Sequence, residues 1–138
     1  MAKRKPATAA QKPKTAPEAS FAWTPQPGSQ TLFMSCPAFE CLYHGTRGPG
    51  KTDALLMDFA QHVGEGFGAA WRGVLLRRQY PDLAEVIAKS NKWFGLVANG
   101  GRYNKAKSTW TWPTGEELLF RQFKNPGDYR LEVTCPGE

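Results

Sequence analysis

The residues best suited to chemistry form one glycine-rich run that ends in a lysine and a threonine, Gly45-Thr-Arg-Gly-Pro-Gly-Lys-Thr52. The run matches the phosphate-loop pattern Gly-x-x-x-x-Gly-Lys-Thr at every fixed position. Gly45, Gly48 and Gly50 allow tight backbone turns, in which successive N–H groups point toward a phosphate chain. Lys51 brings a positive charge to the β- and γ-phosphates, and Thr52 offers a hydroxyl ligand for Mg²⁺. The run therefore predicts a nucleotide-phosphate site.

The variable positions of the loop are Thr46, Arg47 and Pro49. We expect these residues to line the same phosphate chain, because the loop must wrap around it. The alternative interpretation is a glycine-rich turn that carries a lysine without binding any phosphate.

The segments on either side of the loop indicate a strand and a helix. Cys41-Leu-Tyr43 is a short apolar run before the loop and favours a buried strand. After the loop, apolar residues recur three and four positions apart: Ala54, Leu55, Met57 or Asp58, Phe59 and Val63. This spacing predicts a helix that begins near Gly50 and directs the positive end of its dipole at the phosphates.

The rest of the chain predicts a layered domain. Arg72–Arg78 contains a Val/Leu run bounded by charge, which is typical of a buried parallel strand. A helix should follow, with Asp82 as its N-cap and Gly95 at its end. Residues 109–113 and 118–123 flank a Pro-Thr-Gly turn and predict a β-hairpin. The expected fold class is α/β, with P-loop NTPase-type βαβ layers, a mainly parallel sheet and the added hairpin.

Composition places the chain among globular proteins. It has 138 residues, of which 41% are hydrophobic, and it contains 5 Trp, 4 Tyr and 8 Phe. No apolar run approaches the roughly 20 residues of a membrane span, and the basic N-terminus lacks the apolar core of a secretory signal. Cys36, Cys41 and Cys135 form no Cys-x-x-Cys pair. Their spacing argues against zinc and for ordinary thiols in a reducing cytoplasm.

The formal net charge of +6 is concentrated at the N-terminus. Residues 1–20 contain one acidic side chain, Glu18, and five basic ones: Lys3, Arg4, Lys5, Lys12 and Lys14. Residues 1–22 are low in complexity, so we expect a disordered basic tail ahead of a domain at residues 23–138. Such a tail either contacts a polyanion such as DNA or is simply solvated.

Four segments together point to a known family. They are Pro27-Gly-Ser-Gln-Thr-Leu-Phe33, Tyr43-His-Gly-Thr-Arg-Gly-Pro-Gly-Lys-Thr52, Gly73-Val-Leu-Leu-Arg-Arg78 and Trp110-Thr-Trp-Pro-Thr-Gly-Glu-Glu-Leu-Leu-Phe120. In order and spacing they resemble the N-terminal ATPase region of the large terminase subunit of tailed bacteriophages, the motor that pumps DNA into the capsid. The resemblance implies ATP and Mg²⁺ as cofactors. It also implies double-stranded DNA, the phage portal and the small terminase subunit as partners, a homo-oligomeric motor with no membrane part, and a location in the host cell cytoplasm.

The resemblance also gives several residues candidate roles. Arg47 and Lys51 would be catalytic, with the Arg47 guanidinium stabilising transition-state phosphate charge through two oxygens; otherwise Arg47 contacts ground-state phosphate or solvent. Gln30 matches an upstream glutamine whose amide can pair with an adenine edge, and the alternative is a surface glutamine. Arg77 and Arg78 end the expected strand at the edge where such sheets bind ligands, or are solvated there.

The aromatic side chains of the hairpin have two possible roles. They are Trp110, Trp112, Phe120 and Phe123. Cross-strand packing is favoured over stacking on nucleic-acid bases.

The C-terminal part of the sequence departs from the pattern of this family. ATP hydrolysis in this superfamily needs an apolar strand that ends in Asp, usually followed by a catalytic Glu. Asp128, Glu132 and Glu138 follow no such strand, and there is no room for a nuclease domain. We therefore interpret residues 23–138 as a partial P-loop ATPase domain, incomplete at the C-terminus, that binds ATP–Mg²⁺ and hydrolyses it poorly or not at all alone. The alternatives are a small DNA-binding or interaction protein that retains the loop as structure, or another P-loop ATPase of helicase-like or kinase-like type.

Overall fold

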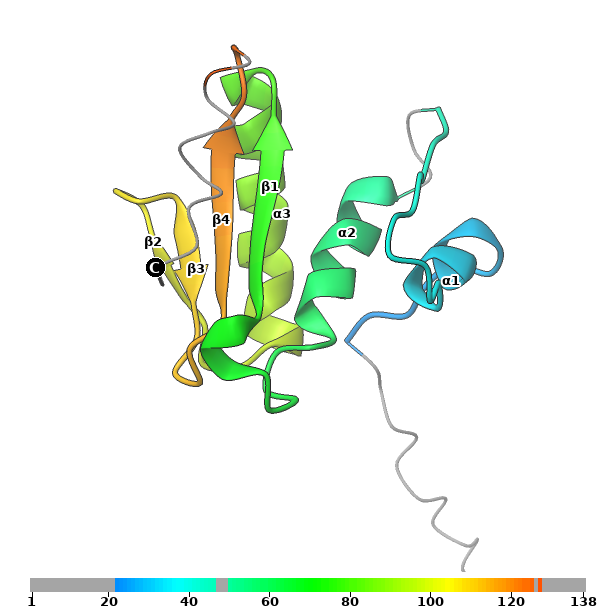
Figure 1. The fold of residues 1–138 in the computed structure, drawn as a ribbon, viewed down its shortest axis with the longest axis horizontal. Coiled ribbons are helices and arrows are strands. Elements are labelled where there is room, and N and C mark those ends of the chain that lie inside the picture. Colours follow the sequence, from blue (N-terminus) through cyan, green and yellow to red (C-terminus); the bar gives the residue numbers. More distant parts are fainter. Residues whose placement is uncertain (1–21, 47–49, 126, 128–138) are drawn as a thin grey trace, which may run out of the picture.

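The domain consists of a four-stranded sheet with helices packed on one face. The computed structural model describes residues 22–46, 50–125 and 127. Its strands are β1 (Arg72–Arg77), β2 (Arg102–Asn104), β3 (Thr109–Thr111) and β4 (Glu117–Gln122). Its helices are α1 (Ser29–Met34), α2 (Lys51–Ala60) and α3 (Tyr80–Val97), with a short 3-10 helix, η1, at Gly68–Ala70. In Figure 1, α3 lies along the sheet, α2 lies beside β1, and α1 lies on the far side of α2.

The sheet is mixed, with the strand order β1-β4-β3-β2. β1 and β4 pair in parallel, whereas β4 with β3 and β3 with β2 pair antiparallel. The α/β class is therefore confirmed, but the prediction of a mainly parallel sheet is wrong. The reason is that α3 separates β1 from β2, whereas β2, β3 and β4 follow one another through short turns, which favour antiparallel neighbours. The finer expectation of a P-loop NTPase architecture stays a prediction.

The predicted β-hairpin is confirmed by the β3–β4 pairing, in which Trp110 lies opposite Leu118. The Trp112 N–H donates to the Glu116 carbonyl at 3.1 Å and closes the turn. No sequence pattern predicted β2, which adds three residues to the outer side of the hairpin. So short a strand has no periodicity of its own to detect.

The helix after the loop begins where it was expected, since α2 starts at Lys51 with Gly50 as its N-cap. α3 is longer than predicted at both ends. Its N-cap is Gln79 rather than Asp82, because Pro81 in the first turn already has the φ that a helix needs. Gly95 lies within α3 rather than at its end. A glycine there costs about 1 kcal/mol relative to alanine, and the packing of the buried Phe94 on the core offsets this.

The predicted strand at Cys41–Tyr43 is wrong, because this segment has no regular structure. Leu42 is 87% exposed. The Tyr43 ring instead stacks on Phe33 of α1, with ring centroids 5.0 Å apart. The Tyr43 and Ser29 hydroxyls are also within hydrogen-bond distance, at 3.3 Å. The segment therefore packs against α1 rather than joining the sheet.

The core lies between the helices and the sheet and is rich in tryptophan. Its most buried large side chains include Phe94, Phe120 and Leu56. Each indole N–H in and around this layer has an acceptor, as buried tryptophans require. The pairs are Trp71 to the Phe59 carbonyl, Trp93 to Asp53, Trp110 to the Ser90 hydroxyl and Trp112 to the Ala98 carbonyl. These bonds connect α2 to α3 and to the residue before β1, and they connect α3 to the hairpin, so that α2 is held in place against the rest of the domain.

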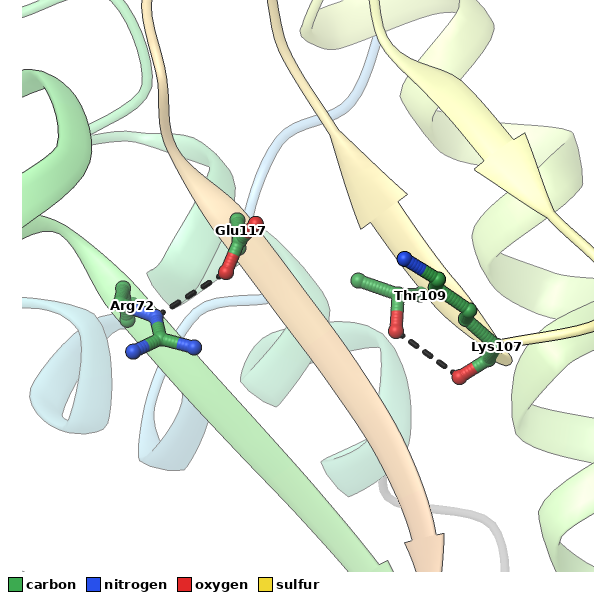
Figure 2. Close-up of polar contacts among 4 residues, drawn as sticks. All are labelled: Arg72, Lys107, Thr109 and Glu117. Atoms are coloured by element: carbon green, nitrogen blue, oxygen red, sulfur yellow. Dashed lines mark hydrogen bonds and ion pairs between the residues drawn. The ribbon is translucent and has the colours of Figure 1, made fainter. Parts of the chain in front are cut away.

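β1 is an edge strand whose outer face is partly open. Val74 and Leu76 remain 44% and 37% exposed, while Gly73 packs toward Phe59 on the helix side. In Figure 2, the Arg72 guanidinium meets the Glu117 carboxylate across β1 and β4, at 3.0 Å. On the neighbouring strand the Thr109 hydroxyl donates to the Lys107 carbonyl, at 2.9 Å. None of the helices in the described ranges has the length and apolarity to cross a bilayer.

Candidate functional site

The phosphate-loop residues lie at the start of α2. Gly50, Lys51 and Thr52 form its N-cap and first turn, and Gly45 and Thr46 end the segment that leads into the loop. Arg47, Gly48 and Pro49 lie outside the described residues, so the proposed role of Arg47 remains a prediction.

The Lys51 side chain folds back over the loop. Its ammonium donates to the Gly45 carbonyl at 2.9 Å and to the Thr46 carbonyl at 2.6 Å. The charge is thereby held between the entrance of the loop and the first turn of α2, rather than extended into solvent. Phosphate oxygens that reach this position can replace the two carbonyls as acceptors of charge-assisted hydrogen bonds.

Gly50 joins the loop to the helix in a conformation that favours glycine. Its φ is 67° and its ψ is 24°, which is the left-handed region. Its carbonyl accepts the first helical bond, from the Ala54 N–H at 2.9 Å. Because glycine has no side chain, the N-cap residue makes no side-chain bond to the first-turn amides. These amides and the positive end of the helix dipole face the loop, as an anion site requires.

Gln30 is buried next to Gly50, the N-cap of α2, with only 3% of its surface exposed. Its amide nitrogen donates to the Gly50 carbonyl at 3.0 Å, and its amide oxygen accepts from the Gln26 N–H at 2.7 Å. The alternative of a surface glutamine is therefore wrong. Pairing of this amide with an adenine edge would require the loss of these backbone contacts.

The residues present fit a magnesium ion held mainly by phosphate and water. Thr52 is half-buried in the first turn of α2, and the next carboxylate, Asp53, accepts from the Trp93 indole at 3.1 Å. Within residues 22–46, 50–125 and 127, no three His, Cys, Asp or Glu side chains form a cluster that could hold a metal. One hydroxyl fits Mg²⁺ bound to nucleotide, because this ion keeps several waters and uses phosphate oxygens. Asp128, Glu132 and Glu138 lie outside the described residues.

β1 ends at the same end of the domain at which α2 begins (Figure 1). Arg77 is the last residue of β1, and Arg78 follows it directly. Arg77 donates to the Leu76 carbonyl at 3.2 Å. Arg78 is exposed, and its carbonyl accepts from the Gln122 amide at 3.3 Å. Their place at the carboxyl end of a strand agrees with the expectation, but no contact links them to the described loop residues.

The hairpin aromatics pack into the core, as favoured from the sequence. Trp110, Trp112 and Phe120 are 6%, 5% and 1% exposed. Trp110 and Trp112 pack edge-on against Phe94 of α3. Phe123 is half-buried just beyond β4. The three buried rings therefore have no free face on which a nucleic-acid base could stack, which removes one support of the DNA-binding alternative.

Among the residues that the structure describes, three titratable groups have a shifted pKa, and the sequence predicted no role in the site for any of them. The pKa of the exposed Cys41 thiol is raised, first by partial desolvation and then by a hydrogen bond with Cys36. Burial also raises the pKa of Asp58, against the lowering effects of His62 and Gln61. Cys36 and Cys41 are free thiols, and Cys135 lies outside the described residues.

The third group, Glu116, is a fully buried carboxylate that no sequence signal distinguished from its neighbour Glu117. It accepts hydrogen bonds from the Thr114 hydroxyl and, at 3.0 Å, from the Gly64 N–H. Burial is the largest single effect and raises its pKa, but these hydrogen bonds together outweigh it, so the pKa lies below its ordinary value. Because it connects the turn after α2 to the hairpin, Glu116 has a structural role.

Comparison of the chain with protein-family models, with curated proteins and with solved structures finds no match.

Proposed function

We propose that this chain binds ATP–Mg²⁺ through the phosphate loop that runs from Gly45 to Thr52. The observation that carries the proposal is the position of the Lys51 ammonium over the Gly45 and Thr46 carbonyls, in a sequence that matches the loop pattern throughout. Lys51 would bind the β- and γ-phosphates, and Thr52 would supply one ligand to Mg²⁺. Arg47 would add charge stabilisation.

The resemblance of four segments to large terminase subunits supports a narrower proposal. On this proposal the chain is the ATP-binding segment of a DNA-packaging motor, in which ATP hydrolysis in the complete protein drives translocation of double-stranded DNA. Its partners would be the portal, the small terminase subunit and further copies of itself. Without a second acidic site, this segment alone would hydrolyse ATP poorly.

Lys51→Ala tests the proposed site. Loss of the charge-assisted contacts should weaken ATP–Mg²⁺ binding by about 10- to 100-fold, measured by isothermal titration calorimetry. Lys89→Ala is the matched control, because Lys89 lies on α3, where it pairs with Glu85 at 3.3 Å. Unchanged affinity in Lys51→Ala would refute the assignment, and equal losses in both variants would show an unspecific charge effect.

A further inference from the structure

We propose that Gln30 is a positioning residue of the phosphate loop, which acts on phosphate binding whatever base the nucleotide carries. This inference rests on the proposed function, because it concerns the same site. It differs from a base-reading role, in which the amide of the glutamine would be presented to the nucleotide.

The first support is that both ends of the Gln30 amide are bound to backbone. The oxygen accepts from the Gln26 N–H, and the nitrogen donates to the Gly50 carbonyl, 20 residues further along the chain. With 3% of its surface exposed, the side chain is enclosed rather than presented to a ligand. It thus connects the chain around α1 to the N-cap of α2.

The second support is the fit between Gln30 and Gly50. A Cβ added at Gly50 would collide with the Gln30 amide nitrogen, and the φ of Gly50 is already in the left-handed region. Glycine at this position therefore serves two purposes: the backbone turn and the close approach of the Gln30 amide.

The third support concerns the direction of the first amide of the helix. The Gly50 carbonyl accepts two hydrogen bonds, one from the Ala54 N–H and one from Gln30. Because the peptide unit is planar and trans, fixing this carbonyl also fixes the Lys51 N–H, which points the opposite way, toward the loop. Gln30 therefore orients a donor that a phosphate would use and the backbone from which the Lys51 side chain extends.

Two substitutions separate the contacts of Gln30. Gln30→Glu keeps an acceptor for the Gln26 N–H but replaces the donor to Gly50 with an oxygen, and Gln30→Met keeps the length without polar atoms. Gln61→Glu is the matched control, because that side-chain amide donates to the Asp58 carboxylate at the opposite end of α2 from the loop. Binding of ATP, GTP and inorganic tripolyphosphate, each with Mg²⁺, is measured for every variant.

We expect both Gln30 variants to weaken all three ligands by the same factor, about 3- to 10-fold for one lost hydrogen bond, with the ratio of ATP to GTP affinity unchanged. The control should bind as the wild type does. Weaker ATP binding with unchanged tripolyphosphate binding would show base reading and overturn the inference. Unchanged binding of all three ligands would also overturn it. If the wild type binds none of them, the proposed function itself fails.

A measurement on the wild type covers the case in which the variants do not fold. The side-chain amide signals of Gln30 are followed by NMR while tripolyphosphate or adenosine is added. A positioning role predicts that tripolyphosphate shifts these signals and that adenosine does not. A response to adenosine alone, or to neither ligand, would overturn the inference.

Discussion

Replacing Glu116 with glutamine should reveal how strongly one buried carboxylate holds the turn after α2 to the hairpin. The carboxylate accepts from the Gly64 N–H and the Thr114 hydroxyl. Hydrogen bonds to a charged acceptor contribute about 1 kcal/mol more than neutral ones, so two such bonds suggest about 2 kcal/mol. Gly64 and Thr114 are exposed, so water nearby screens the charge and lowers the expected loss to about 1–2 kcal/mol. For a domain of about 100 residues this loss of stability corresponds to a fall in Tm of about 5–10 °C.

The pH dependence of stability gives a second readout for the same variant. The pKa of Glu116 is lowered in the folded state, below the ordinary value of 4.5. Its stabilising contribution is therefore fully present above the pKa of the unfolded chain, and it is lost as the pH falls through the lower folded pKa. Glu116→Gln should lack this component, so its Tm should fall less than that of the wild type below about pH 4.5.

Differential scanning calorimetry across a pH series measures both effects. Glu117→Gln is the control, since this neighbouring carboxylate pairs with Arg72 in a half-exposed ion pair (Figure 2) and should contribute less than about 1 kcal/mol. A Glu116→Gln protein with the Tm and the acid profile of the wild type would refute the structural role of this carboxylate.

Three further predictions follow from the packing. Ser90→Ala leaves the buried Trp110 indole N–H without its acceptor and should lower stability to chemical denaturation by about 1–3 kcal/mol; an unchanged midpoint would contradict the contact. Gly73→Ala places a Cβ 2.8 Å from the Phe59 ring and should destabilise the protein by about 1–3 kcal/mol. Gly95→Ala meets open space within a helix and should stabilise the protein by about 1 kcal/mol. The opposite order of the two stabilities would refute this packing. β1 lies at the edge of the sheet, and Val74 and Leu76 are exposed on its outer face, so the isolated protein should be marginally stable or oligomeric, with a Tm that depends on concentration. A sharp, concentration-independent transition from a demonstrated monomer would contradict it.

Local signals predicted much of the fold. The helix after the loop followed from apolar spacing and from the glycine at its start. The hairpin followed from a Pro-Thr-Gly turn between the alternating residues 109–113 and the largely apolar residues 118–123. Both features depend on residues close together in the chain. The start and end of α3 were misplaced by a few residues, because Asp82 and Gly95, which were expected to bound the helix, both lie inside it.

Features that depend on distant contacts could not be predicted. Cys41–Tyr43 is apolar enough for a strand, but the stacking of Tyr43 on Phe33 places it against α1. The proportion of parallel pairs depended on which strands became neighbours. Glu116 and Glu117 are adjacent carboxylates with different environments, and only a contact with Gly64, 52 residues away, distinguishes them. For the site, the resemblance singled out Gln30, but its contact with Gly50 could be found only in the structure.

Binding of nucleotide phosphates by the loop can be observed by adding ATP–Mg²⁺ to the isotope-labelled wild-type protein and recording its backbone amide NMR spectrum. We expect saturable shifts that are largest for the amides of Gly45, Thr46, Lys51 and Thr52 and that are lost in Lys51→Ala. A spectrum that does not change, or shifts confined to the sheet and the hairpin, would contradict it.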